Sequence, residues 1–179
     1  MKKAIFQGCA TAIVTPFTSD TIDYAALQKL VDFQLAAGID AIVVCGTTGE
    51  ASTMTHVEQM RTIETVMTRV NGRIPVIAGT GSNNTTTAVM LSQEAESLGV
   101  DGLLIVTPYY NKATQKGLIM HYETIADATS TPIILYNVPS RTGISCTAET
   151  YAALSMHPNI VGVKEASGNL ALIQKTRNL

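Results

Sequence analysis

Lys164 is the residue whose position most directly suggests chemistry. It ends the apolar run Ile160–Val163 and precedes the polar segment Glu165–Asn169. An ammonium group on a buried strand is costly, because burial disfavours the charged form. Burial would therefore favour the neutral amine, which attacks carbonyl carbons to form a Schiff base. The alternative is a structural lysine that reaches water at the strand end or pairs with a carboxylate.

A tyrosine and an arginine lie close together after another apolar run, in the segment Tyr136–Gly143. The phenol of Tyr136 can serve as a general acid or base if a carbonyl or hydroxyl group comes within hydrogen-bond reach. The guanidinium of Arg141 can hold a carboxylate through two parallel hydrogen bonds. The alternative is a tyrosine at the rim of a strand and a solvated arginine.

The segment Gly46–Glu50 places Thr47 and Thr48 at an expected strand-to-helix turn. Two hydroxyl groups together with backbone amides suit a small carboxylate better than a phosphate. A purely structural turn is the alternative reading of this segment.

Metal and nucleotide cofactors are not expected. His56, His121 and His157 lack the spacing of metal ligands, and surface or capping roles are expected for them. Gly79–Gly81 opens like a dinucleotide fingerprint, but Asn84 stands where its last glycine belongs, and there is no P-loop.

Composition indicates one compact domain with a substantial hydrophobic core. The chain has 179 residues, 46% of them hydrophobic, and a net charge of −2. This balance predicts no nucleic-acid or membrane-surface partner, and the apolar stretches are too short for a membrane-spanning helix. Cys9, Cys45 and Cys146 are too few and too scattered for a disulfide framework, which favours a reducing, cytoplasmic setting.

Short apolar runs alternate with longer helical patterns. The expected strands are Ala10–Val14, Ala41–Cys45, Val76–Ala78, Gly102–Val106, Ile133–Tyr136 and Ile160–Val163. The expected helices are Tyr24–Ala37, Val57–Val70, Thr86–Leu98, Gly117–Ala128 and Ala148–Met156, with another starting near Leu170. Strands that are apolar on both faces and separated by helices favour a parallel sheet covered by helices.

Local signals support these elements. Thr55–Glu58 has the pattern of a capping box at a helix start, and Gly38 and Gly99 follow helical patterns as C-terminal caps. The segment Gly38–Val44 also resembles Gly99–Ile105, which indicates a repeated helix-to-strand unit.

Polar and glycine-rich clusters follow every expected strand, beginning at Thr15, Gly46, Gly79, Thr107, Tyr136 and Lys164. In a closed TIM (β/α)8 barrel all of them meet at the C-terminal face, where such enzymes place their chemistry. An open doubly wound sheet, the alternative, spreads them along a line. A barrel needs eight βα units in about 250 residues. We therefore expect residues 1–179 to form a single barrel domain that supplies about the first six units and is truncated at the C-terminus.

The chain resembles the dihydrodipicolinate synthase family of pyruvate-dependent class I aldolases from Ile5 to its end. The most specific matching pieces are Gly46–Glu50, Pro108–Asn111, Tyr136–Gly143 and Val163–Gly168. The related N-acetylneuraminate lyases resemble the chain in its lysine and tyrosine. They typically carry serine at the second position of the threonine-rich loop, and they lack the run Asn137–Gly143.

The resemblance implies a lyase that condenses pyruvate with aspartate-4-semialdehyde to give 4-hydroxy-tetrahydrodipicolinate, in lysine and diaminopimelate biosynthesis, without a cofactor. Lys164 is expected to form the Schiff base with pyruvate. Tyr136, Thr47 and Tyr110 are expected to form a proton relay. Tyr110 would enter the site of a neighbouring copy, which implies a homo-oligomer, either a dimer or a tetramer.

The resemblance also assigns substrate contacts. Thr47 and Thr48 are expected to contact the pyruvate carboxylate, and Arg141 is expected to receive the carboxylate of aspartate-4-semialdehyde. Two alternatives stay open: another pyruvate-dependent aldolase similar to N-acetylneuraminate lyase, and an inactive fragment that only binds or assembles with partners.

Feedback inhibition by lysine is expected to be weak or absent. Residues at positions that match the family's lysine site are Ala51, Ser52, His56, Asn83 and Tyr109. Gln59 stands where lysine-sensitive members often carry histidine, and Thr87 stands where they carry glutamate. The missing carboxylate removes a natural partner for the lysine ammonium.

Overall fold

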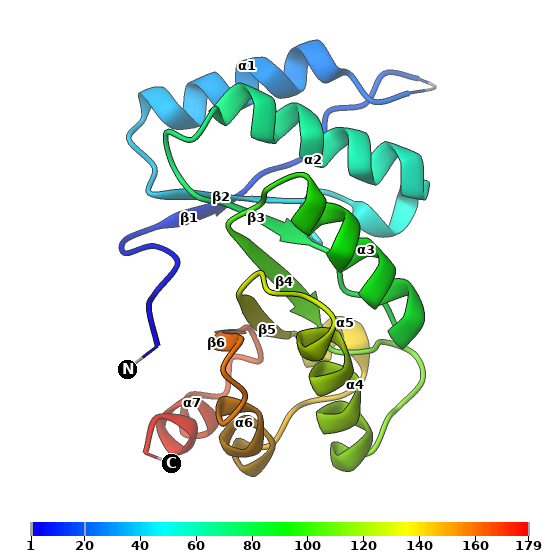
Figure 1. The fold of residues 1–179 in the computed structure, drawn as a ribbon, viewed down its shortest axis with the longest axis vertical. Helices are drawn as coiled ribbons and strands as arrows, with labels where there is room; N and C mark the ends of the chain where they lie inside the picture. Colours follow the sequence, from blue (N-terminus) through cyan, green and yellow to red (C-terminus); the bar gives the residue numbers. More distant parts are fainter. Residues whose placement is uncertain (1, 20, 179) are drawn as a thin grey trace.

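A computed structural model describes residues 2–19 and 21–178 of the chain. Its centre is a parallel sheet of six strands in sequential order (Figure 1). The strands are β1 (Ala10–Ala12), β2 (Ala41–Val44), β3 (Val76–Gly79), β4 (Gly102–Val106), β5 (Ile133–Asn137) and β6 (Ile160–Glu165). All six predicted strands are confirmed: β4 has the predicted bounds, and the other five differ by one or two residues at their C-terminal ends.

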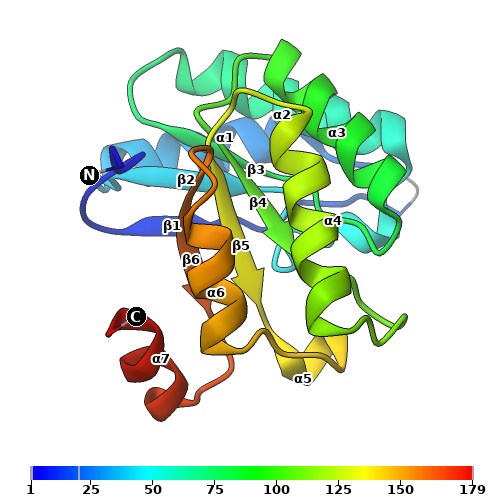
Figure 2. The same ribbon diagram turned by 60° about the horizontal axis from the view of Figure 1, so that its bottom comes forward.

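The helices lie along the outer side of the curved sheet (Figures 1 and 2). They are α1 (Tyr24–Ala36), α2 (His56–Val70), α3 (Thr85–Ser97), α4 (Gln115–Asp127), α6 (Ala148–Ser155) and α7 (Leu170–Arg177). These confirm the predicted helices. Two short elements were not predicted: the 3₁₀ turn η1 (Ala51–Thr53) and the helix α5 (Pro139–Thr142).

Both faces of the four central strands, β2 to β5, are largely buried. Ile42 and Val44 of β2 join the large apolar core between the sheet and the helices, whereas Ala41 and Val43 join a smaller cluster on the opposite face. Successive side chains of a strand point to opposite faces, so a strand of this kind must be apolar at every position. Tyr136 belongs to the smaller, inner cluster.

The predicted capping signals are present. The backbone N–H of Glu58 donates to Thr55 Oγ1 at 3.3 Å, and the backbone N–H of Thr55 donates to a Glu58 carboxylate oxygen at 2.8 Å. This capping box satisfies N–H groups that the first helical turn leaves unpaired. Gly38 and Gly99 follow α1 and α3 with φ of +74° and +80°, a conformation that glycine adopts readily.

The sequence echo between two helix-to-strand connections has a structural counterpart. Asp40 accepts the backbone N–H of Cys9 at 2.7 Å, and Asp101 accepts the backbone N–H of Val76 at 2.8 Å. Each aspartate therefore ties the start of its own strand to the strand before it. The ties lie at the N-terminal ends of the strands and leave the C-terminal ends free to build a site.

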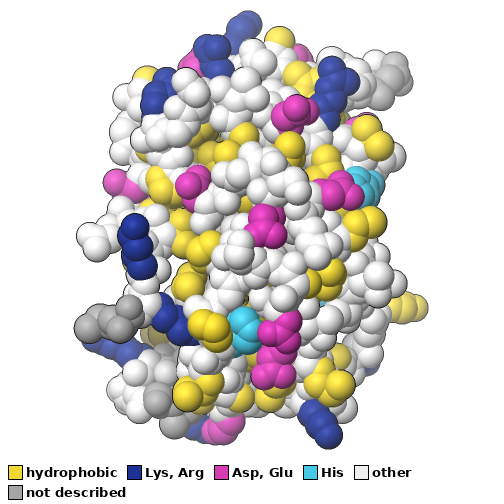
Figure 3. All heavy atoms as spheres, in the orientation of Figure 1, with side chains coloured by type: hydrophobic (Ala, Val, Ile, Leu, Met, Phe, Trp, Pro, Cys, Tyr) yellow, Lys and Arg dark blue, Asp and Glu magenta, His cyan; other side chains and the backbone are white. Residues whose placement is uncertain are grey.

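The six strands form a half-barrel, which confirms the predicted barrel units. In the described part of the chain, β1 and β6 are the two edges of the sheet. No described helix is both long and apolar enough to cross a membrane. The face seen in Figure 3 scatters basic and acidic side chains without a field of one sign.

Candidate active site

Two predicted catalytic residues lie side by side at the ends of neighbouring strands. Tyr136 of β5 is paired directly with Lys164 of β6. The Lys164 amine nitrogen lies 4.2 Å from the centre of the Tyr136 ring. Tyr136 is buried, with 6% of its surface exposed. The structure thus brings the predicted nucleophile together with the predicted acid–base group.

The expectation that Lys164 is buried is wrong for this chain. Its side chain is only half-buried, and the preceding Val163 is 38% exposed. The physical reason is that β6 is an edge strand among the described residues, so no further strand covers its open side. The argument for a nucleophile therefore depends on the position of Lys164 beside Tyr136 and not on desolvation.

A cavity of about 510 Å³ opens at the C-terminal ends of β2 to β5. Thr47, Tyr136 and Arg141 contribute to its wall, together with backbone at Gly46, Gly79 and Gly81. Lys164 is not among the lining residues, but its amine lies over the ring of Tyr136, which does line the cavity. Tyr109 lines the cavity as well, so four of the predicted clusters, those beginning at Gly46, Gly79, Thr107 and Tyr136, do converge.

The turn after β2 is packed closely against neighbouring backbone. Cys45 is buried and has φ of +53°, a conformation that L-residues rarely adopt. A Cβ atom on Gly79 would lie 2.1 Å from the Cys45 carbonyl oxygen, so the strands can approach this closely only with glycine there. Thr47 and Thr48 stand exposed on this fixed turn. Their contact with a pyruvate carboxylate stays a prediction.

Arg141 is held at the rim of the cavity by α5. Pro139 begins this short helix, and Gly143 ends it with φ of +72°. The Thr142 hydroxyl donates to the carbonyl oxygen of Ile144 at 2.9 Å and fixes the turn that follows. The exposed Arg141 side chain therefore reaches the cavity from an ordered segment.

Tyr110 does not meet the other relay residues within this chain. Its side chain is 89% exposed, and its φ of +70° is strained for a bulky residue. The Tyr110 backbone N–H donates to the carbonyl oxygen of Thr142 at 3.3 Å, which anchors the strained residue to the end of α5. The role of Tyr110 in a neighbouring site stays a prediction.

Most positions of the expected lysine site line the same cavity, namely Ala51, Ser52, His56, Gln59, Thr87 and Tyr109. Asn83 lies outside this set, and its carbonyl oxygen accepts from Asn111 at 2.9 Å. The Gln59 amide donates to the carbonyl oxygen of Gly79 at 3.1 Å, and His56 pairs with Glu94 at 2.6 Å. No acidic side chain belongs to the cavity wall in the described part of the chain.

The histidines do not assemble into a metal site. His56 pairs with Glu94 at the start of α2, and His157 pairs with Asp127. The expected surface or capping role is wrong for His121, which α4 buries against Thr85 of α3. The described residues contain no group of three or more His, Cys, Asp and Glu side chains arranged to hold a metal ion.

The sequence reasoning missed a polar network behind the Lys164–Tyr136 pair. Asn137 and Glu165, which directly follow Tyr136 and Lys164, are hydrogen-bonded to each other on the helix side of the sheet. The sequence did contain a sign of this network, because Asn137 and Glu165 are polar residues at the ends of two mainly apolar strands.

Comparison with known proteins gives consistent matches. Residues 5–179 match the Dihydrodipicolinate synthetase family. The 4-hydroxy-tetrahydrodipicolinate synthase of Geobacter metallireducens is 57% identical over 166 residues, covering 93% of this chain and 57% of that protein. A solved dihydrodipicolinate synthase from Thermotoga maritima has a TM-score of 0.96 at 43% identity, covering 98% of this chain and 60% of that one. The chloride-inhibited enzyme from Acinetobacter baumannii, complexed with pyruvate, has a TM-score of 0.92 at 47% identity, covering 96% and 60%. The chain thus spans 57% to 60% of the length of these proteins.

Proposed function

Because the chain belongs to the dihydrodipicolinate synthetase family, we propose that it carries the Schiff-base site of a lyase that condenses pyruvate with aspartate-4-semialdehyde. The product is 4-hydroxy-tetrahydrodipicolinate, on the route to lysine and diaminopimelate. The observation that carries the proposal is the position of the Lys164 amine, 4.2 Å from the centre of the Tyr136 ring. The proposal is supported by an amine that lies beside a phenol whose ring lines a cavity of about 510 Å³.

The proposed chemistry begins with attack of the Lys164 amine on the ketone carbon of pyruvate. Loss of water gives an iminium ion, and loss of a methyl proton gives an enamine. The enamine carbon attacks the aldehyde carbon of the second substrate, whose oxygen takes up a proton. The amino group of that substrate then attacks the iminium carbon, and Lys164 leaves as a free amine while the ring closes.

Each proton transfer needs a group that can both give and take a proton. The phenol of Tyr136 suits this role because it adds no fixed charge beside the iminium ion. Thr47 lines the same cavity and can extend the relay. The full relay that we propose also includes Tyr110.

Carboxylate recognition completes the proposed site. Thr47 and Thr48 present hydroxyls on the rigid turn after β2, which fits the pyruvate carboxylate. Arg141 lines the same cavity as Thr47, and its guanidinium fits the carboxylate of aspartate-4-semialdehyde.

We propose that the active form is a homo-oligomer, a dimer or a tetramer. The support is the Tyr110 side chain, which is held in a strained backbone conformation and is 89% exposed among the described residues of its own chain. A mixture of a Lys164→Arg chain with a Tyr110→Phe chain tests this. Shared sites predict more activity in the mixture than in either variant alone. The three free cysteines support a reducing, cytoplasmic setting.

The direct test is a condensation assay with pyruvate and aspartate-4-semialdehyde, run beside a cleavage assay with N-acetylneuraminate. We expect condensation and no sugar-acid cleavage. Lys164→Arg should abolish condensation, whereas Lys116→Arg, which changes an exposed lysine of α4, should leave it unchanged. Cleavage of the sugar acid without condensation would replace this proposal with a neuraminate-lyase activity.

A further inference from the structure

Behind the Lys164–Tyr136 pair, the opposite face of the same two strands carries a polar network in which Asn137 is buried and Glu165 is partly buried. Asn137 and Glu165 are paired across β5 and β6, one position beyond Tyr136 and Lys164. Because side chains alternate along a strand, they point away from the cavity and toward the helices. Asn137 is completely buried.

The carboxylate of Glu165 accepts hydrogen bonds from three separate elements. The Asn137 side-chain amide of β5 donates to both carboxylate oxygens, at 3.1 and 3.0 Å. The Tyr151 hydroxyl of α6 donates at 2.6 Å, and the backbone N–H of Ser167 in the following turn donates at 2.8 Å. Figure 2 shows α6 lying against β5 and β6. One side chain therefore joins the end of β6 to a strand, a helix and a turn.

Asn137 is itself held on every side. Its amide also donates to the Ser145 hydroxyl at 3.0 Å, and its side-chain oxygen accepts the backbone N–H of Cys146 at 3.2 Å. The Asn137 carbonyl oxygen accepts the backbone N–H of Ala166 at 2.8 Å. These hydrogen bonds fix the position of the Asn137 side chain, which is the partner of Glu165.

The negative charge of the Glu165 carboxylate is stabilised by hydrogen bonds from uncharged donors and not by a cation. None of the ion pairs among the described residues involves Glu165. Burial acts to raise the pKa of Glu165, but the hydrogen bonds from Tyr151, Ser167 and Asn137 outweigh it and keep that pKa below its usual range. An apolar pair would fill this space without the cost of desolvating a carboxylate. Packing alone therefore does not explain why a carboxylate stands at position 165.

The alignment of β6 supplies that reason. The β5–β6 ladder has a register irregularity between Ile133 and Ile134, near the start of both strands. Register near the ends must therefore be fixed locally, since a slip of one residue would turn Lys164 to the helix side. Among the described residues β6 is an edge strand with a backbone partner on one side only.

We propose that Glu165 is a positioning residue, which fixes the end of β6 against Asn137 and Tyr151 so that the Lys164 amine stays beside Tyr136. The inference rests on the proposed Schiff-base function of Lys164. Glu165 itself points away from the cavity and does not touch substrate.

Three variants in the full chain test the geometry. Glu165→Gln places an amide N–H₂ group among donors, and Asn137→Asp sets two carboxylates against each other. The double exchange, Asn137→Asp with Glu165→Gln, restores one carboxylate and one amide but moves the charge from β6 to β5. Glu149→Gln is the matched control, because it neutralises an exposed glutamate of α6 that pairs with Lys175.

The readout is the rate at which borohydride traps the pyruvate imine on Lys164 at saturating pyruvate, with the melting temperature measured in parallel. We expect each single exchange to slow trapping by roughly tenfold or more, since small displacements of reacting groups have effects of this size. The double exchange should recover most of the rate, and Glu149→Gln should match the unaltered chain. The pyruvate concentration that gives half the maximal trapping rate should change little, because the groups proposed to bind the pyruvate carboxylate lie elsewhere.

If Glu165→Gln does not fold, Tyr151→Phe keeps the packing and removes a single hydrogen bond, and it should slow trapping by a few-fold. Trapping at the unaltered rate in Glu165→Gln would overturn the inference. So would a double exchange that regains its melting temperature but stays slow. An unaltered chain that forms no adduct on Lys164 would instead overturn the proposed function, together with this inference.

Discussion

The amine of Lys164 lies 4.2 Å from the centre of the Tyr136 ring, and the two residues are paired directly across β5 and β6. A cation over an aromatic face gains only about 0.5–1 kcal/mol at exposed sites. That is too little to immobilise a half-buried lysine. We therefore expect the amine to leave the ring when it attacks a ketone, while the strand pairing keeps the backbone of Lys164 in place.

Replacing Tyr136 with phenylalanine distinguishes the role of the aromatic ring from the role of its hydroxyl group. Tyr136→Phe keeps the packing and the face that Lys164 contacts, so pyruvate should still be trapped on Lys164. Loss of the acid–base group should slow exchange of the pyruvate methyl protons with deuterium by about 10²–10⁴-fold. Nuclear magnetic resonance measures this exchange directly. Exchange at the unaltered rate would remove Tyr136 from the relay.

Replacing Arg141 with lysine tests recognition of the second substrate. Arg141→Lys keeps the charge but loses the paired hydrogen bonds to a carboxylate, which contribute about 1.5–3 kcal/mol. The KM for aspartate-4-semialdehyde should therefore rise by roughly 10- to 100-fold. Borohydride trapping of pyruvate should be unaffected. Weakened trapping with an unchanged KM would reassign Arg141 to pyruvate.

Lysine should inhibit weakly or not at all. Thr87 and Gln59 line the cavity, which has no acidic side chain in its described wall. A lysine ammonium group therefore has no carboxylate partner there. Isothermal titration calorimetry with L-lysine should show no strong binding, and Thr87→Glu should increase the affinity. Strong inhibition by sub-millimolar lysine would contradict this.

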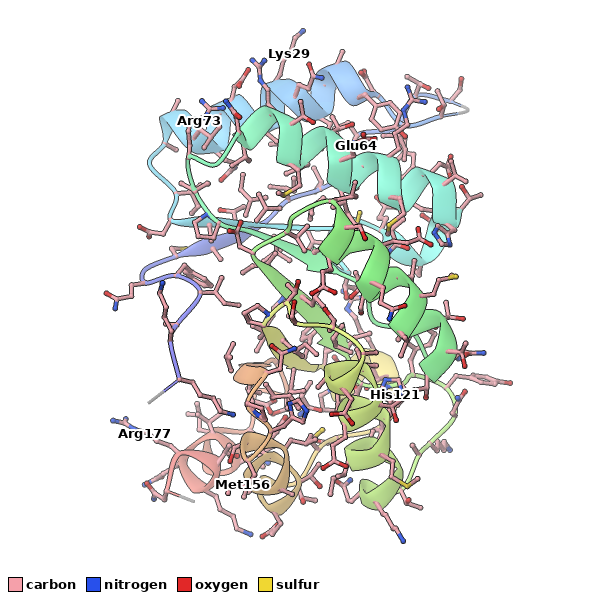
Figure 4. All side chains as sticks on the ribbon, viewed as in Figure 1. Lys29, Glu64, Arg73, His121, Met156 and Arg177 are labelled. Atoms are coloured by element: carbon pink, nitrogen blue, oxygen red, sulfur yellow. The ribbon has the colours of Figure 1, made fainter. Side chains whose placement is uncertain are left out.

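The buried His121 predicts a loss of stability on acidification. It lies between α3 and α4 (Figure 4), where the Thr85 hydroxyl is 2.9 Å from Nδ1, and Nε2 has no hydrogen-bond partner among the described residues. Burial lowers the pKa of His121 from 6.5 to about 4. The folded state thus binds its proton less readily than the unfolded state, so the contribution to stability is full above pH 6.5 and is lost as the pH falls toward 4.

Melting temperatures of the unaltered chain and of His121→Gln, measured across this pH range, check the point. Glutamine can keep a hydrogen bond to Thr85 and does not titrate. The variant should lose less stability between neutral pH and pH 4 than the unaltered chain does. Parallel pH curves for the two proteins would show that His121 is not the group responsible.

The sequence predicted the strands and helices well because their signals are local. A continuous apolar run identifies a buried strand. The capping box at Thr55 marks the start of α2, and a glycine marks the end of α1 and of α3. The place of the site was also predictable, since polar clusters after parallel strands must share one end of the sheet.

Other features depend on which residues become neighbours. The exposure of Lys164 is decided by what lies beyond β6, and the burial of His121 by how α4 packs on α3. The link between Asn137 and Glu165 depends on the register of two strands that lie far apart in sequence. The helix α5 has only four residues, too few for any periodic pattern to show.

The central claim is that Lys164 forms an imine with pyruvate. The chain should be incubated with pyruvate and borohydride, digested, and mapped by peptide mass spectrometry. We predict a reduced pyruvyl adduct on the peptide that carries Lys164, and none on that peptide in Lys164→Arg. A chain that stays unlabelled, or carries the adduct on another lysine at equal yield, would contradict the claim.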